Sequence, residues 1–482
     1  MCTFGPSFNN PNSNSMKKTY QSPLLYRVPI GELGDGNYCI THVEGKKILV
    51  DKVAPGDVVD LQILKKKHGS LMGMAIKVHE ESPVRTTPFC SHFLACGGCQ
   101  WQHINYATQL ATKEKLVKDK LITLAHISDP PILPILAADP TQYYRNKLEY
   151  TFSTRRWLTP QEIASQQAFD QPALGFHKKG YFDKVISIEH CFLQVDPSNA
   201  IRMAVDKFVR THGITFYDFR KNTGALRNLI IRTFSTNEVM VIVQFGHAQE
   251  AEITQLMGFL QETFPSLTSL QYVVNTKLNE TFHDLPVHCY AGKPFITEEI
   301  DGLRWQIGPK SFFQTNSMQA KTLYRTVAQL ADLQGDELVW DLYTGVGTIA
   351  HYLAAKAKHV IGIELIENAI ADAKENALLN DIHNVSFYAG DMKDTLQQPC
   401  VRGYGQPQLI VVDPPRAGMH PDVIQQLLEI AAERIIYVSC NPTTQAKDIS
   451  LLASKYTLQQ AQPIDMFPHT SHVENVALLV RK

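Results

Sequence analysis

Two residues near the C-terminus have the types and spacing needed for covalent catalysis. Cys440 lies in the run Ser-Cys-Asn-Pro, and Glu474 stands directly before a final apolar stretch. A thiolate can add to an electron-poor ring and make a neighbouring carbon nucleophilic. A carboxylate can then remove a proton from that carbon, a role that His469 or His472 in the same segment could also fill. The combination predicts chemistry at a carbon that cannot attack unaided.

Uracil is a ring of this kind. Addition of a thiolate to carbon 6 gives an enolate whose carbon 5 can accept a methyl group. Cys440 needs thiolate character for this, so we expect its pKa to lie below the free value of about 8.5. Taken alone, a cysteine at the end of a strand is more often a buried structural residue than a nucleophile.

A glycine-rich loop upstream predicts the site of a nucleotide-like cofactor. Gly345 and Gly347 follow an apolar run that ends at Asp341, and a helical pattern comes next. Such glycines let the backbone approach a ligand at the start of a helix. Glu364 ends the next apolar run, where a carboxylate can accept hydrogen bonds from both ribose hydroxyls. NAD would be held by the same arrangement.

Other features favour S-adenosylmethionine over NAD. The third glycine that is usual in NAD loops is absent. Asp391 stands where methyltransferases hold the adenine end of the cofactor, and Asp413 opens an Asp-Pro-Pro run that would face the methionine moiety and the target base. Enzymes that methylate exocyclic amines carry an aromatic residue after the two prolines, whereas this chain has Arg416. We therefore predict methyl transfer to a carbon atom.

Strand and helix patterns alternate in the part of the chain that must position these residues. Apolar runs cover 339–341, 360–364, 408–413, 434–439 and 476–480, with helical patterns between most of them. This alternation predicts an α/β, Rossmann-like sheet that is mostly parallel, with its site at the carboxyl ends of the strands.

Two further regions lie upstream. Short β-rich runs at 40–43, 47–50, 58–63 and 73–78 predict a small barrel of oligonucleotide-binding type. From about 143 to 295, strands at 229–234 and 239–245 mix with helices at 198–209 and 249–264, which predicts an α+β region. Between the two regions a helix should begin after Asn105, with one apolar face (Tyr106, Leu110, Val117, Leu121 and Leu124) and a lysine-rich opposite face.

Four of the nine cysteines form a second candidate site. Cys90, Cys96 and Cys99 are spaced C-x5-C-x2-C, and Cys191 lies far downstream. Four thiolates suit either a zinc ion or a 4Fe–4S cluster, and the spacing alone leaves both open. Nine cysteines in 482 residues are too few for a disulfide framework, so we expect a cytoplasmic protein.

Length and composition set broad limits. A chain of 482 residues predicts two or three domains. The net charge of −1 gives no sign of a nucleic-acid partner, although a local basic groove would suffice. The sequence contains no run of about 18 apolar residues, so it predicts no membrane span. The N-terminal stretch is rich in Asn, Ser and Pro and lacks the layout of a secretory signal, so residues 1–20 are expected to be a disordered leader.

Together these motifs resemble the uracil-C5 RNA methyltransferases, which form 5-methyluridine, and in particular the branch acting on 23S ribosomal RNA. Residues 438–442 are similar to the family's nucleophile motif, and residues 466–474 are similar to its base motif. The second match implies that Glu474, rather than either histidine, is the base. Residues 312–316 resemble a cofactor-binding segment, which implies that Gln314 binds S-adenosylmethionine.

The same resemblance implies the other ligand contacts. S-adenosylmethionine would be bound by Gln314, Tyr343, Gly345, Thr348, Glu364, Asp391 and Asp413, with Thr348 standing where the family often carries Asn. Cys90, Cys96, Cys99 and Cys191 would hold a structural or RNA-orienting 4Fe–4S cluster, since residues 97–103 continue the match. Arg145, in an aromatic and basic run, would approach the target base.

The domains implied are a TRAM-like RNA-binding barrel at 21–86, a central α+β iron–sulfur domain at 87–295 and a catalytic methyltransferase domain at 296–482. The segment at about 103–130 would pack on the catalytic domain. The expected partner is RNA, foremost ribosomal RNA, with no DNA and no membrane, and the expected state is a monomer.

Two other functions stay open. Cytosine-C5 RNA methylation would also use thiolate addition, although enzymes of that kind commonly have a cysteine next to the Asp-Pro-Pro run, which this chain lacks. A non-catalytic RNA-binding or ribosome assembly factor could retain the same fold. Replacing Cys440 would then leave RNA affinity and cellular function unchanged.

Overall fold

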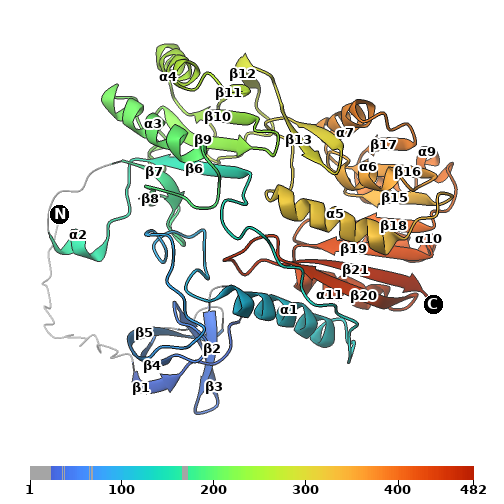
Figure 1. The fold of residues 1–482 in the computed structure, drawn as a ribbon, viewed down its shortest axis with the longest axis horizontal. Coiled ribbons are helices and arrows are strands. Elements are labelled where there is room, and N and C mark those ends of the chain that lie inside the picture. The colour runs from blue at the N-terminus through green and yellow to red at the C-terminus, as the bar shows by residue number, and fades with distance from the viewer. Residues whose placement is uncertain (1–22, 35, 37, 65, 67–68, 166–171) are drawn as a thin grey trace, which may run out of the picture. The chain divides into compact units, whose positions relative to one another are not determined.

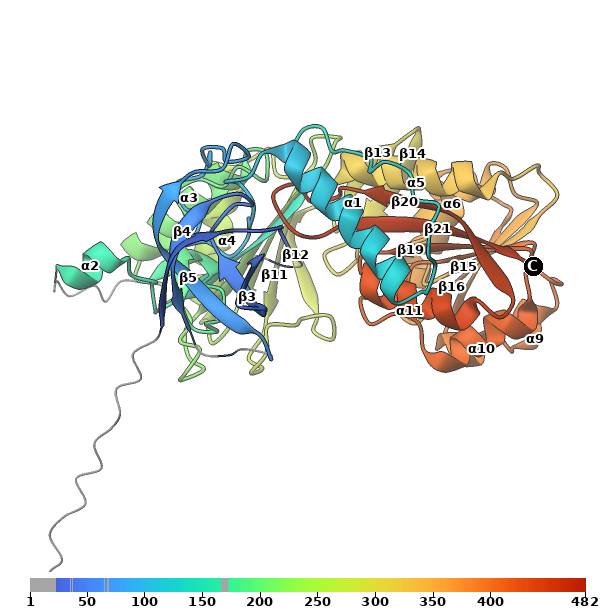
Figure 2. The same ribbon diagram turned by 90° about the horizontal axis from the view of Figure 1, so that it is seen from below.

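The computed structural model describes residues 23–34, 36, 38–64, 66, 69–165 and 172–482. The predicted leader over residues 1–20 lies outside them. The chain divides into two compact units, of which the first runs to Pro83 apart from residues 34–37 and the second covers those residues and Val84–Lys482. Figures 1 and 2 show the elements of each unit from two sides.

The first unit is a five-stranded sheet whose two ends meet. Its strands are β1 (Leu24–Pro29), β2 (Tyr38–Val43), β3 (Lys46–Asp51), β4 (Val58–Ile63) and β5 (Leu71–Glu80), in the order β1-β4-β5-β3-β2. Leu33, just beyond β1, forms a bridge with Cys39 in β2, and this bridge closes a small barrel. Val59 and Leu61 are fully buried inside it. The four predicted strands are confirmed, and β1 is an addition.

The predicted helix after Asn105 is α1 (Tyr106–Thr123), and the Asn105 side chain caps its first turn. Val117 and Leu121 are buried, as expected, in the core of the C-terminal sheet. Figure 2 shows α1 lying along β20 and α11. Lys113 lies on this buried face and is completely buried itself, because an acidic side chain of the C-terminal region meets it there.

The central region of the second unit is built on a seven-stranded sheet in the order β12-β11-β10-β9-β6-β7-β8. The strands are β6 (Lys147–Ser153), β7 (Ala173–His177), β8 (Val185–Ser187), β9 (Leu226–Thr233), β10 (Val239–Phe245), β11 (Ser269–Val274) and β12 (Val287–Gly292). The helices α3 (Ser198–Thr211) and α4 (Glu250–Thr263) cover one face of this sheet, and α2 (Pro160–Ala164) is a short separate helix (Figure 1). The strands and helices predicted here are confirmed.

A hairpin that the sequence analysis missed joins the central and C-terminal regions. It consists of β13 (Ile296–Ile300) and β14 (Leu303–Ile307). Trp305 in this hairpin is fully buried, in one hydrophobic core with Met240 of the central sheet and Val339 of the C-terminal sheet. The two regions therefore share a continuous core.

The C-terminal region has a second seven-stranded sheet, in the order β17-β16-β15-β18-β19-β21-β20. Its strands are β15 (Leu338–Leu342), β16 (His359–Glu364), β17 (Val385–Ala389), β18 (Leu409–Val412), β19 (Arg434–Ser439), β20 (Tyr456–Ile464) and β21 (Glu474–Arg481). The first five strands in this order run parallel to one another, β21 pairs antiparallel with β19, and β20 pairs antiparallel with β21. This confirms the predicted Rossmann-like sheet, to which β17 and β20 are additions.

Helices pack on both faces of the C-terminal sheet. They are α5 (Ser317–Ala331), α6 (Thr348–Ala354), α7 (Glu367–Leu379), α8 (Met392–Thr395), α9 (Pro399–Arg402), α10 (Pro421–Ile430) and α11 (Pro442–Leu452). Residues of α5, α6 and α7 belong to one core cluster, and residues of α1, α10 and α11 belong to another. Within the described part of the chain, no helix is long and apolar enough to cross a membrane.

Candidate active site

The antiparallel pairing of β19 with β21 places Cys440 beside Glu474. Ser439 lies opposite Asn475 in this pairing, so the next residue beyond β19 faces the first residue of β21. Cys440 is half-buried in a pocket of about 200 Å³ that Arg416 and His472 also line. Glu474 is only 5% exposed. The two residues predicted to act as nucleophile and base therefore lie together.

Burial and charge raise the pKa of both groups. Burial raises the pKa of Glu474 to about 8; the neighbouring Asp413 adds to the rise and Arg416 opposes it. Burial also raises the pKa of the Cys440 thiol; Glu474 adds to this rise, and a hydrogen bond with Arg416 lowers it. The expectation of a lowered Cys440 pKa is therefore wrong, because burial beside a carboxyl group outweighs the guanidinium.

Arg416 is a site residue that the sequence analysis did not single out for this role. Its backbone oxygen accepts hydrogen bonds from Asn441 Nδ2 at 2.9 Å and from Thr444 Oγ1 at 3.3 Å. These bonds tie the Asp-Pro-Pro-Arg segment after β18 to the segment that carries Cys440. The signal in the sequence was its position directly after the two prolines, which was used only to decide between amine and carbon chemistry.

The two histidines that rivalled Glu474 have different surroundings. His469 is buried, and burial lowers its pKa to about 4. Its backbone N–H donates to Gln109 Oε1 at 2.9 Å, and its Nδ1 lies 3.3 Å from Gln109 Nε2. His472 lines the pocket of Cys440. His472 is therefore the histidine that the structure brings to the pocket.

Four acidic residues lie at the carboxyl ends of adjacent parallel strands. Asp341 lies in β15, Glu364 ends β16, Asp391 follows β17 and Asp413 follows β18. Burial raises the pKa of Asp341 to about 7 and that of Asp413 to about 7, with Asp341 adding to the second shift. Asp391 is exposed and accepts a hydrogen bond from the backbone of Lys393 at 3.1 Å. This acidic edge is where the sequence analysis places the cofactor.

The loop between β15 and α6 is open on one side. Tyr343 and Gly345 have positive φ angles of 65° and 58°. The backbone N–H of Gly345 donates to Glu364 Oε2 at 3.2 Å, and a Cβ added at Gly345 would meet no atom within 4 Å. Thr348 begins α6, and its hydroxyl forms a hydrogen bond with Tyr324. The loop therefore offers a ligand open space and backbone groups, and the Thr348 hydroxyl already has one partner.

The central region holds the segment that carries Gln314. Asn146 Nδ2 donates to Gln314 O at 2.9 Å and to Ser317 Oγ at 2.8 Å. Arg145, the preceding residue, donates from Nε to Lys147 O at 2.9 Å, and its guanidinium lies 5.9 Å from the centre of the Phe467 ring. The predicted substrate residue and the predicted cofactor residue are thus joined through Asn146.

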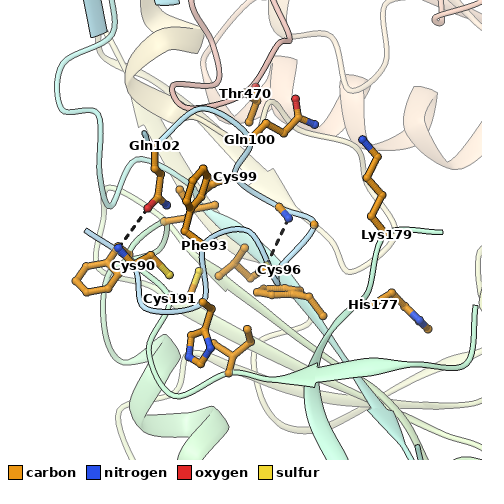
Figure 3. Close-up of a pocket in the computed structure, with 18 of the residues that line it drawn as sticks. Cys90, Phe93, Cys96, Cys99, Gln100, Gln102, His177, Lys179, Cys191 and Thr470 are labelled. Atoms are coloured by element: carbon orange, nitrogen blue, oxygen red, sulfur yellow. Dashed lines mark hydrogen bonds between the residues drawn. The ribbon is translucent and has the colours of Figure 1, made fainter. Parts of the chain in front are cut away.

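All four cysteines predicted as cluster ligands line one cavity of about 590 Å³ in the central region (Figure 3). Burial raises the pKa of Cys99 to about 12, and the thiols of Cys96, Cys191 and Cys90 add to the rise. Gln102 Oε1 accepts a hydrogen bond from Cys90 N at 3.2 Å. Among the described residues, no three His, Cys, Asp or Glu side chains are arranged so that they could hold a metal ion. Arg145 lines the same cavity.

Known proteins resemble this chain along most of its length. Residues 300–482 match the family described as tRNA (uracil-5-)-methyltransferase. A protein of Bacteroides thetaiotaomicron, described only as an RNA methyltransferase, is 51% identical over 444 residues, which cover 91% of this chain and 98% of that protein. The chain belongs to the RNA uracil-5-methyltransferase family. The family predicted from the motifs is thereby confirmed.

Other relatives extend the likeness to the whole architecture. An RNA methyltransferase of Porphyromonas gingivalis is 47% identical to this chain, over 93% of this chain and 98% of that protein. The solved tRNA (uracil-54, C5)-methyltransferase of Pyrococcus abyssi, in complex with S-adenosyl-L-homocysteine, is 28% identical. It matches with a TM-score of 0.74 and covers 94% of this chain and 100% of its own. The fold is therefore that of a known methyltransferase.

Proposed function

We propose that this protein transfers a methyl group from S-adenosylmethionine to carbon 5 of a uridine in RNA, and that this RNA is 23S ribosomal RNA. The observation that carries the proposal is the pairing of Cys440 with Glu474 at the ends of β19 and β21, beside Arg416, which lines the pocket of Cys440 and acts on the pKa of both groups. Family membership supports uracil carbon 5 as the target. The resemblance of the barrel and of the cysteine spacing to the ribosomal branch supports the choice of RNA.

The residues of this pocket have complementary tasks. Arg416 favours the thiolate of Cys440, which adds to carbon 6 and moves the ring electrons toward carbon 5. S-adenosylmethionine, when bound, supplies the electrophilic methyl group for carbon 5. Glu474 then removes the carbon-5 proton; the double bond between carbons 5 and 6 reforms, and Cys440 leaves as a thiolate. The target uridine must leave its stack to enter the pocket.

The residues around the open loop fit S-adenosylmethionine. The open side of Gly345 admits a ligand close to the backbone, and acidic groups stand at the neighbouring strand ends. The proposed contacts are Gln314, Tyr343, Gly345, Thr348, Glu364, Asp391 and Asp413. The Pyrococcus relative, solved with S-adenosyl-L-homocysteine, supports this cofactor.

The cysteine cavity fits a 4Fe–4S cluster in its donor set. Four thiols line one space, and three of them lie close enough to raise the pKa of the fourth, Cys99. We propose that Cys90, Cys96, Cys99 and Cys191 hold the cluster, which would cross-link their segments, and that Arg145 contacts RNA beside it. The first unit would be a TRAM-like RNA-binding barrel. The protein would act as a monomer in the cytoplasm, where thiols stay reduced.

The decisive experiment maps 5-methyluridine by mass spectrometry in ribosomal RNA from cells with and without this gene. The expected result is the loss of methylation at one or more uridines of 23S RNA, restored by the wild-type gene and not by Cys440→Ala. In vitro, methyl transfer should occur to RNA whose only pyrimidine is uridine and not to RNA whose only pyrimidine is cytidine. If methylation of the ribosomal RNA is unchanged without the gene, ribosomal RNA is not the substrate. If the methyl group is transferred only to cytidine, the protein does not methylate carbon 5 of uracil.

A further inference from the structure

The 465–473 loop, which leads into Glu474, is irregular in structure and is held by side chains from outside it. Consecutive carbonyls accept hydrogen bonds: Asp465 O from Gln319 Nε2 (2.9 Å), Met466 O from Asn316 Nδ2 (2.9 Å), Phe467 O from Lys113 Nζ (3.1 Å), Pro468 O from Tyr144 Oη (3.1 Å), and His469 O from the backbone of Gln100 (2.7 Å) and Trp101 (3.0 Å). An irregular buried segment needs such partners for its backbone groups. Because five consecutive carbonyls of the loop accept hydrogen bonds, these bonds hold the loop in one conformation.

Lys113 of α1 provides the charged contact at the start of the loop. The side chains of Lys113 and Asp465 are both 0% exposed, and Lys113 Nζ lies 2.6 Å from Asp465 Oδ1. The same carboxylate accepts hydrogen bonds from Tyr106 Oη at 2.9 Å and from Phe467 N at 3.0 Å. A buried ion pair is weak evidence for stability by itself, because desolvation offsets the attraction. Its geometric effect is to hold the first turn of the loop against α1.

The same face of α1 also holds the middle of the loop. Gln109 lies one turn before Lys113, and its Oε1 accepts a hydrogen bond from His469 N at 2.9 Å. Gln109 Nε2 donates to Trp101 O at 3.1 Å and to Ile104 O at 2.8 Å. The helix therefore fixes the loop at two points on its way to Glu474.

The far end of the loop lies in the active-site pocket. His472 and Val473 line the pocket of Cys440, together with Leu116 of α1. Glu474 follows Val473 directly. A shift of the loop on α1 would therefore move the carboxylate relative to the thiol.

We propose that Lys113, acting through Asp465, is a positioning residue for Glu474. This inference rests on the proposed function. It assigns to Lys113 the task of holding the carboxylate where the carbon-5 proton appears after methyl transfer. Glu474 takes a proton only in the last step, so its displacement slows release of Cys440 far more than it changes addition of the thiolate. Displacements on the order of 1 Å can cost about a hundredfold in rate.

The test compares Lys113→Met with Lys115→Met on uridine-containing RNA and S-adenosylmethionine. Lys115 lies on the same helix and forms an exposed ion pair with Asp119, so it provides a matched control. We expect Lys113→Met to form a denaturant-resistant protein–RNA adduct at close to the wild-type rate and to release it about 10- to 100-fold more slowly. Lys115→Met should behave as wild type. Wild-type release by Lys113→Met, or an equal loss of addition and release, would overturn the proposal.

A second variant separates positioning from folding. Lys113→Met alone leaves a buried carboxylate without its partner, whereas Lys113→Met/Asp465→Leu removes both charges and should unfold at a higher temperature than the single variant. Release should stay slow in the double variant, because the contacts to Phe467 remain lost. If the double variant regained both its thermal stability and fast release of the adduct, the inference would be rejected. A wild-type protein that forms no adduct and methylates no uridine would instead reject the proposed function.

Discussion

The two cysteine sites of this protein differ in what surrounds the sulfur. Cys440 stands in a pocket of about 200 Å³, where a guanidinium and a carboxyl group act on its pKa in opposite directions. The four cysteines of the central region line a cavity of about 590 Å³, where burial and neighbouring thiols raise the pKa of Cys99. A single thiol among tunable charges suits attack and departure. Four thiols around one space are the donor set of the proposed 4Fe–4S cluster. The neighbours, rather than the residue type, distinguish the two sites.

The largest effect is expected for Cys440→Ser. A serine hydroxyl cannot replace the thiolate, so turnover should fall by about 10,000-fold or more, measured as 5-methyluridine formed per enzyme. RNA containing 5-fluorouridine should trap wild-type protein as a stable adduct, because fluorine cannot leave as a proton, and should not trap the variant. Iron content should stay at the wild-type value. If this variant turned over at the wild-type rate, Cys440 would not be the nucleophile, and the distinction between a catalytic thiol and cluster-binding thiols would be lost.

Glu474→Gln should have the second-largest effect. The amide cannot take the carbon-5 proton, so turnover should fall by about 100- to 10,000-fold while an adduct accumulates on ordinary uridine RNA. Gel electrophoresis under denaturing conditions measures that adduct. His472→Ala is the matched control in the same pocket. An equal adduct with His472→Ala and none with Glu474→Gln would transfer the role of base to the histidine.

Turnover should depend on pH through Glu474. The base must be ionised and its pKa is about 8, so the rate with saturating substrates should rise with pH and level off above about 8. Stability should change in the opposite direction. Between the usual pKa of 4.5 and about 8, the folded protein keeps a proton that the unfolded chain loses, so this group makes the free energy of unfolding fall as pH rises.

Glu474→Gln provides the check on that linkage. Urea unfolding at pH 5, 6.5 and 8 should show a shallower loss of stability in the variant than in the wild type. The pKa values of Asp341 and Asp413 are also raised, to about 7, so these two groups still make the variant less stable as pH rises. Equal slopes would contradict the raised pKa of Glu474.

Arg416→Ala should have a moderate effect on the reactivity of the Cys440 thiol, because it removes the positive charge that distinguishes the surroundings of Cys440 from those of the four cysteines. Without the guanidinium the Cys440 pKa should rise further, so alkylation by iodoacetamide at pH 7 should slow by roughly tenfold. Arg416→Lys should recover part of this rate, because it restores a positive charge. Mass spectrometry of the Cys440 peptide measures the rate. Alkylation faster than wild type would reverse the assigned sign.

The smallest effect on Cys440 is expected from changing the other site. If the proposed 4Fe–4S cluster is present, Cys99→Ser removes one of its ligands and should lose iron and sulfide, measured by chemical analysis and visible absorbance. Alkylation of Cys440 should change by less than about threefold, since the two thiols have separate neighbours. If the reactivity of Cys440 fell as much as the iron content, the two cysteine sites would depend on each other.

Local patterns predicted most of the fold. The strands that end near Asp341, Glu364 and Cys440 are buried, so they appear in the sequence as unbroken apolar runs. The β13–β14 hairpin was missed, although Trp305 within it joins two cores. Its strands are short, and their burial depends on sheets that lie far away in the chain.

The sequence by itself determined the family, the Rossmann-like sheet and the residues to consider as nucleophile, base and cysteine ligands, because these depend on runs and motifs of neighbouring residues. Only the tertiary structure decided the environment of each group. The burial of Lys113 was not predicted, since lysine is rarely buried without a partner, and its partner Asp465 lies 352 positions away. The pKa of Cys440 likewise depends on burial and Glu474, which raise it, and on Arg416, which lowers it, and only the folded sheet brings these groups beside it. Burial and charge pairing are long-range properties, and short patterns do not contain them.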